Sequence, residues 1–106
     1  MTFVVNNIRW KTVFVPTDSF LLRRSDGSYT IGVTDRNTHC VYLSDILQGS
    51  KLRKVFTHET CHVICMSYDI HLPIEQEEFL CDFVATYGDE IFNIVNIMFE
   101  MLKEVA

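Results

Sequence analysis

Residues 51–68 read Lys-Leu-Arg-Lys-Val-Phe-Thr-His-Glu-Thr-Cys-His-Val-Ile-Cys-Met-Ser-Tyr, and this stretch decides how the fold is interpreted. Its apolar residues recur at helical spacing and Ser50 suits an N-cap, so we predict a helix over 51–68. Within it, residues 58–62 form the pentapeptide H-E-x-x-H. Because helical residues four apart lie one turn above each other, His58 and His62 should project from the same face.

The pentapeptide has the composition of a metal site. Two imidazoles one helical turn apart can bind a single Zn²⁺ ion through bonds of about 2.0–2.1 Å each. Glu59, next to the first histidine, would face a metal-bound water and act as its general base. A helix interior has little use for three ionisable groups unless they meet a cation or each other. The sequence therefore predicts His58 and His62 as metal ligands and Glu59 as the catalytic base.

A catalytic zinc site uses three protein ligands, and the third is expected from a later helix that faces the first. Glu78 is the leading candidate, because Asp82 lies one turn further on and can accept the N–H of a ligand histidine. Glu77 is the close alternative, since periodicity fixes the rotation of this helix only to within one residue. Glu75, nearer the connector, and Cys81, as a thiolate, are the remaining alternatives.

The other histidines and the tyrosines receive no firm role. We expect His39, in a strand, and His71, in a connector, to be surface residues. Four residues could each donate a hydrogen bond to a developing oxyanion, namely Tyr42, Tyr68, Tyr87 and His71. Each of them is more often a packing residue, so the sequence assigns none of them to the site.

Size and composition limit the classes of function. The chain has 106 residues, 48% of them hydrophobic, which suits one compact domain over residues 1–106. A net charge of −5 disfavours a nucleic-acid partner, which requires a basic surface. The sequence has neither an apolar run of about 18 residues nor a secretory signal, so we expect a cytoplasmic protein that does not cross a membrane.

The cysteines fit the same compartment. The chain has four of them, at positions 40, 61, 65 and 81, and no pair forms a C-x-x-C motif. Cys61 and Cys65 lie one turn apart in the predicted helix, which is poor geometry for a disulfide bond. We therefore expect small buried thiols in a reducing cytosol.

The first half of the chain alternates β-like runs with turn signals. The candidate strands are residues 10–15, 19–23, 29–34 and 39–43. Asp26-Gly27 and the segment 35–38 form two tight turns in succession, which predicts an antiparallel meander. If the strand around Val41 is the sheet edge, an extended peptide could add to it and reach the metal.

The second half is helical. After a connector over residues 69–73, a second helix begins with Pro73 in its first turn and runs to about Tyr87. Gly88 predicts a break, and Asp89 predicts the cap of a third helix over residues 90–104. The predicted architecture is therefore α+β, with a small antiparallel sheet followed by the motif helix and one or two further helices.

With the pentapeptide on a helix after a short sheet, and Glu78 with Asp82 following, the chain resembles the zincin metallopeptidases of the gluzincin type. Its small size and the acidic stretch leading to Phe83-Val84-Ala85 look most like the ImmA/IrrE-like group, which is common on phages and mobile elements. The resemblance covers roughly residues 29–85. The chain departs from that group in lacking a clear Glu-Ala-Asn before Phe83 and an accessory DNA-binding domain.

The resemblance implies a zinc-dependent peptidase that cleaves a specific protein or peptide substrate inside the cell, often a regulator. It implies that His58, His62 and Glu78 bind zinc and that Glu59 is the catalytic base. Two alternatives stay open. One is a non-catalytic zincin-like module that binds a protein, with structural metal or none, and the other is a metal-dependent hydrolase that acts on a different bond.

Overall fold

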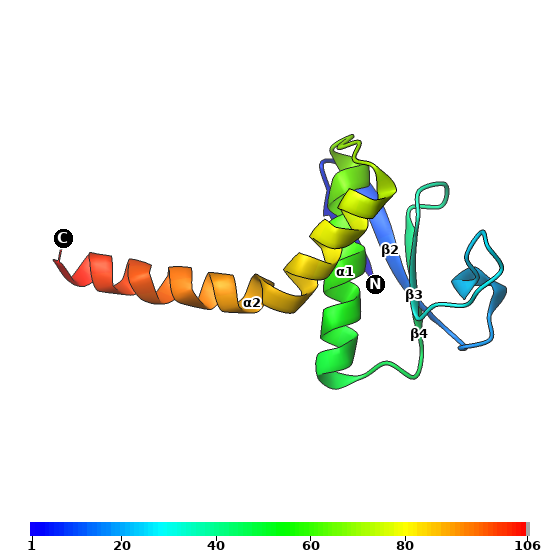
Figure 1. The fold of residues 1–106 in the computed structure, drawn as a ribbon, viewed down its shortest axis with the longest axis horizontal. Helices are drawn as coiled ribbons and strands as arrows, with labels where there is room; N and C mark the ends of the chain where they lie inside the picture. Colours follow the sequence, from blue (N-terminus) through cyan, green and yellow to red (C-terminus); the bar gives the residue numbers. More distant parts are fainter. Residues whose placement is uncertain (106) are drawn as a thin grey trace.

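The computed structural model describes residues 1–105 and shows a sheet followed by two helices (Figure 1). The elements in chain order are β1 (Thr2–Val5), β2 (Ile8–Val15), the 3₁₀ turn η1 (Phe20–Leu22), β3 (Gly32–Asp35), β4 (Cys40–Ser44), α1 (Gly49–Ser67) and α2 (Ile74–Val105). The predicted α+β class is confirmed. The motif helix α1 is the first helix after the sheet, as the sequence indicates.

The sheet is mixed, with strand order β1-β2-β4-β3. β3 and β4 pair antiparallel, but β4 also pairs with β2 in parallel, with Thr12 opposite Val41. The predicted antiparallel pairing is therefore correct for β3 with β4, but the predicted meander is wrong because β2 and β4 are parallel. The long segment between β2 and β3 lets β4 insert between them. The strand around Val41 is consequently central, and the expectation that it forms an edge is also wrong, because β3 occupies that edge.

Two local features of the first half differ from the prediction. β1, which the sequence did not indicate, forms a hairpin with β2 through Asn6 and Asn7. Both asparagines have positive φ angles, of 49° and 65°, as a tight two-residue hairpin turn requires. The predicted strand at 19–23 is instead η1, because the Ser19 side chain accepts a hydrogen bond from the Leu21 amide and closes a turn.

The main core lies between the sheet and α1. Its buried members are Trp10, Val41, Leu43, Leu47 and Val63. The Trp10 indole Nε1 donates a hydrogen bond of 2.9 Å to the Ser67 Oγ in the last turn of α1. The Asn6 side-chain Nδ2 donates a hydrogen bond of 2.9 Å to the Ser67 carbonyl oxygen. These two bonds hold the end of α1 on the β1–β2 hairpin, since a buried indole N–H requires a partner.

The helix boundaries also differ from the prediction. α1 begins at Gly49 with Gln48 at its N-cap, so Ser50 lies inside the helix. α2 continues through Gly88, because an isolated glycine costs only about 1 kcal/mol in a helix. The predicted break and third helix are therefore wrong. Asp89 does not cap a helix but accepts bonds of 2.9 and 3.0 Å from the Arg53 guanidinium of α1.

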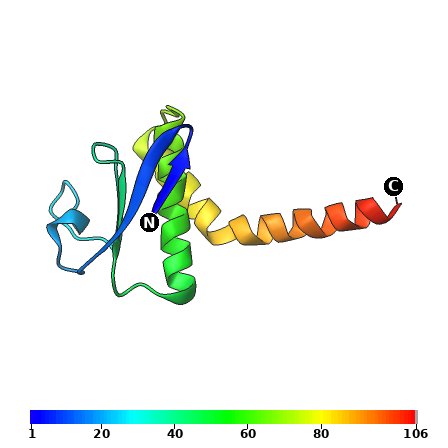
Figure 2. The same ribbon diagram turned by 180° about the vertical axis from the view of Figure 1, so that it is seen from behind.

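α2 first runs back along α1 and then bends away from it, so that its second half projects from the body (Figure 1). Figure 2 shows the same projection from behind, with the sheet in front of α1. The radius of gyration is 16.0 Å, whereas a compact domain of this length has about 13 Å. Within residues 1–105, no helix combines the length and apolarity needed to cross a membrane.

The anchoring of α1 can be tested with Ser67→Ala. We expect this change to lower the free energy of unfolding by about 1–3 kcal/mol, because it leaves the buried Trp10 indole without an acceptor. Urea denaturation followed by tryptophan fluorescence measures the change. Ser50→Ala, on the exposed first turn of α1, is the matched control and should change stability by about 0.5 kcal/mol or less. Equal effects of the two substitutions would contradict the anchoring role.

Candidate metal centre

The two histidines of the pentapeptide lie on one face of α1, turned toward α2. Their imidazole rings are 4.9 Å apart between centroids, and the two Nε2 atoms are 3.2 Å apart. His62 is buried, and the His58 side chain is 18% exposed. The predicted spacing of one helical turn thus places the two Nε2 atoms close enough to bind the same metal ion.

α2 adds a carboxylate to this pair. Glu78 places one oxygen 3.3 Å from the His58 Nε2 and the other 3.0 Å from the His62 Nε2. A tetrahedral zinc ion with bonds of about 2.0–2.1 Å holds its ligand atoms about 3.3 Å apart. His58, His62 and Glu78 therefore form a group that could hold a metal ion, with the separations such an ion requires.

A carboxylate lies beside the outer nitrogen of each imidazole. Asp82 Oδ1 is 2.8 Å from the His58 Nδ1, and Glu77 Oε2 is 2.6 Å from the His62 Nδ1. Each Nδ1–H can donate to its carboxylate, so each Nε2 keeps its lone pair and faces inward. Two imidazole lone pairs and a carboxylate then converge on one point, which is unfavourable unless a cation or a shared proton lies between them.

Glu59 lies on the other side of His58. Its side chain is buried, and its Oε2 is 3.8 Å from the His58 Nε2. The Thr34 hydroxyl of β3 lies 2.8 Å from the Glu59 Oε1 and 3.1 Å from the Glu59 carbonyl oxygen, so its single proton is shared between them. Gly32 makes this approach possible, since a Cβ there would lie 3.0 Å from Val55 Cγ1 and 3.2 Å from Glu59 Cγ.

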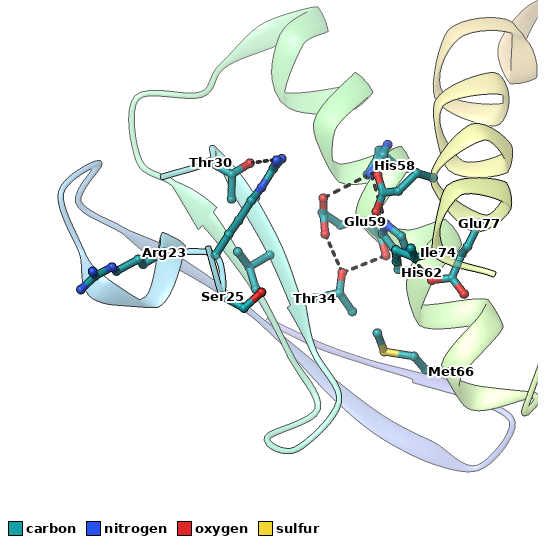
Figure 3. A pocket seen from close by; sticks show the side chains of 14 residues that line it. Arg23, Ser25, Thr30, Thr34, His58, Glu59, His62, Met66, Ile74 and Glu77 are labelled. Carbon is teal, nitrogen blue, oxygen red and sulfur yellow. Dashed lines mark hydrogen bonds and ion pairs between the residues drawn. The ribbon is translucent and has the colours of Figure 1, made fainter. Parts of the chain in front are cut away.

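A cleft of about 600 Å³ opens beside the group, between β3 and the two helices (Figure 3). Glu59, His58 and His62 point into it from α1, and Thr34 faces them from β3. A second hollow of about 390 Å³ shares part of this lining and adds Lys51 and Lys54. The group is thus reached from two sides along the edge strand β3.

The structure separates the candidates for the third position. Glu78 joins the histidines, whereas Glu77 lies on the outer nitrogen of His62. Glu75 is exposed in the first turn of α2. Cys81 is fully buried between the helices. Its burial is the main reason that the pKa of the Cys81 thiol is raised, and a hydrogen bond with the neighbouring Cys61 thiol raises it further. Cys81 therefore has the environment of a neutral core thiol.

The remaining histidines and tyrosines lie elsewhere. His39 is exposed in the turn before β4, beside Trp10, and His71 is exposed in the connector. Tyr42 is buried in a second core cluster near Val15, with its hydroxyl 3.3 Å from that of Thr38. Within the described residues, the linings of both hollows lack Tyr42, Tyr68, His71 and Tyr87, in agreement with the absence of a site role for them in the sequence analysis.

Sequence reasoning missed Thr34 and the role of Gly32. Thr34 sits in a strand far from the motif in sequence, so only the tertiary fold reveals its bond to Glu59. A glycine inside a strand does signal close approach of another backbone or side chain, and Gly32 carries that signal. Arg24, which lines both hollows and donates to Thr30 at 3.3 Å, had no signal beyond its charge.

Two imidazole nitrogens and one carboxylate oxygen are a donor set that can hold a divalent metal ion, and their separations fit such an ion. The chain has no match among protein-family models, curated proteins or solved structures. The case for a metal therefore stands on the geometry and chemistry of His58, His62 and Glu78.

The two adjacent glutamates should differ in their effect on metal affinity. Glu78→Gln removes a ligand charge from the group and should abolish stoichiometric zinc binding. Glu77→Gln weakens the orientation of His62 and should lower zinc affinity about 10–100-fold. Glu75→Gln, at an exposed position of the same helix, is the control and should leave affinity unchanged. Competition titrations with a chromogenic chelator measure all three, and a larger loss for Glu77→Gln than for Glu78→Gln would contradict the assignment.

The histidines can be tested in the same way. We expect His62→Ala to lose bound zinc, because the group then keeps only one imidazole and one carboxylate. His71→Ala changes an exposed histidine of the connector and should retain one zinc per chain. Atomic emission on the purified, dialysed proteins gives the zinc content, and unchanged content in His62→Ala would refute the site.

Proposed function

We propose that the protein is a zinc-dependent hydrolase that cleaves peptide bonds in a specific protein. The observation that carries this proposal is the position of Glu59. Its carboxylate lies beside the His58–His62–Glu78 group and faces the same open cleft. Structural zinc sites are closed by four protein ligands, whereas catalytic sites use three and keep a position open. Three candidate ligands beside an open cleft favour catalysis.

The residues around the group suit the chemistry of hydrolysis. When bound, zinc would polarise the scissile carbonyl and lower the pKa of water toward ~7. Thr34 holds the Glu59 Oε1 at 2.8 Å, which leaves the Oε2 turned toward the group. Glu59 can then accept the proton of the attacking water and deliver it to the leaving amine. Asp82 and Glu77 keep the two imidazoles in the required tautomer and orientation.

The edge strand supports a peptide as the substrate. Among the described residues, β3 pairs with β4 alone and forms one edge of the sheet, and Gly32 and Thr34 line the cleft. An extended peptide that added to this edge would pass the group at the depth of Glu59. The role that the sequence suggested for the strand around Val41 thus passes to β3.

We propose further that the protein is a gluzincin-type zincin of the ImmA/IrrE-like group, which is found on phages and mobile elements. This assignment is supported by the order of the parts, with an edge strand, the pentapeptide helix and a glutamate from the following helix meeting at one point. On that basis we propose intracellular cleavage of a regulatory protein. The alternative, a non-catalytic protein-binding module, requires the metal to be structural or absent.

Glu59→Gln separates catalysis from metal binding. We expect the variant to keep one zinc per chain, because Glu59 is outside the His-His-Glu group, and to lose peptide hydrolysis by about 10²-fold or more. Cleavage of a pooled fluorogenic peptide library, with zinc content measured on the same samples, is the test. Glu75→Gln is the matched control and should keep full activity.

Full hydrolytic activity in Glu59→Gln would contradict the role of Glu59 as the general base. A wild-type protein that binds one zinc tightly and cleaves neither the library nor unfolded proteins would instead support the protein-binding module.

A further inference from the structure

The second half of α2 exposes an unusually apolar surface. Residues 90–105, here called the arm, project from the body (Figures 1 and 2). Ten apolar side chains of the arm are each two-fifths or more exposed: Ile91, Phe92, Ile94, Val95, Ile97, Met98, Phe99, Met101, Leu102 and Val105. Monomeric proteins rarely leave so large a contiguous apolar patch in water. The arm therefore has the character of an interface.

The apolar residues form one broad face. At 100° per residue they span an arc of about 220°, and a narrow polar stripe occupies the rest. The stripe consists of Asn93, Asn96, Glu100, Lys103 and Glu104, and Glu90, at the start of the arm, is the one polar residue within the apolar arc. Together the ten side chains expose on the order of 1,000 Å², compared with the ~800 Å² per partner that a standard interface buries. The arm alone offers enough surface for a stable complex.

The order of apolar residues along the arm is nearly symmetric about Met98. Ile91 and Val105 lie seven residues to either side of it, and Leu102 lies as far after it as Ile94 lies before it. Val95 with Met101, and Ile97 with Phe99, complete the symmetric pairs. Only Phe92 has a polar counterpart, Glu104. A two-fold axis at Met98 would therefore place apolar positions of one arm against apolar positions of an antiparallel copy, as a self-complementary interface requires.

We propose that the arm pairs with the arm of a second copy of this chain, in antiparallel orientation about Met98. The projection of the arm permits this, because the two bodies would lie at opposite ends of the paired helices (Figure 1). The apolar arc is wider than the seam of a two-stranded coiled coil, so two such pairs can stack as a four-helix bundle. The proposal does not depend on the metal site or on catalysis.

The charge of the arm disfavours a membrane surface as its partner. Helices that lie on membranes carry lysine and arginine on the polar face. The polar stripe of the arm has Lys103 as its only cation against Glu100 and Glu104, and the whole chain carries a net charge of −5. Such a stripe would be repelled by anionic lipid, whereas it can stay in water at the outside of a helical bundle.

Sedimentation equilibrium on the full chain tests this proposal. We expect the wild type to sediment at two or four times the chain mass at micromolar concentration. Met98→Glu places two carboxylates face to face at the axis and should raise the dissociation constant about a hundredfold or more. Asn96→Glu adds the same charge on the polar stripe and should leave the assembly intact. Far-UV circular dichroism and urea unfolding followed by Trp10 fluorescence check that each variant is folded.

Three results would overturn the proposal. The first is a wild-type chain that stays monomeric across the concentration range. The second is an equal dissociation constant for the Met98→Glu and Asn96→Glu variants, which would place the interface elsewhere. The third is a monomer that binds vesicles of phosphatidylcholine and phosphatidylserine, which would make the arm a membrane-binding helix instead.

Discussion

The candidate site depends on one crossing of helices, in which α2 brings the Glu78 carboxylate to two imidazoles of α1. Three acceptor atoms about 3 Å apart repel each other unless a cation or shared proton lies among them. The surrounding contacts hold the two imidazoles and the Glu78 carboxylate in this arrangement. Asp82 and Glu77 fix the outer nitrogens of the rings, and the bond from Trp10 to Ser67 holds α1 on the sheet. A cation would convert this strained convergence into a stabilising one.

Helical periodicity made the centre of the site predictable. His58 and His62 share a face because they are four residues apart, and the same rule places Asp82 one turn beyond Glu78. Their convergence in the structure follows from these local rules once α2 packs on α1. The choice between Glu77 and Glu78 was beyond periodicity, because the rotation of α2 about its axis is set by packing. Both carboxylates contact His62, one on each ring nitrogen.

The rest of the structure depends on contacts between residues distant in sequence. The parallel pairing of β2 with β4 places β3 at the sheet edge, and thereby brings Thr34 to Glu59. Turn signals alone favoured a meander, because they report which strands are adjacent in sequence and not which are adjacent in space. At Gly88 the propensity signal was real but small, about 1 kcal/mol, and the flanking helical residues outweighed it.

The most direct measurement of the central claim is X-ray absorption at the zinc edge on the zinc-loaded protein. Our account predicts one zinc per chain with nitrogen and oxygen ligands at about 2.0–2.1 Å, of which two have the outer-shell scattering of imidazole. Sulfur at about 2.3 Å would contradict it, because the metal would then be held by the cysteines between the helices rather than by His58, His62 and Glu78.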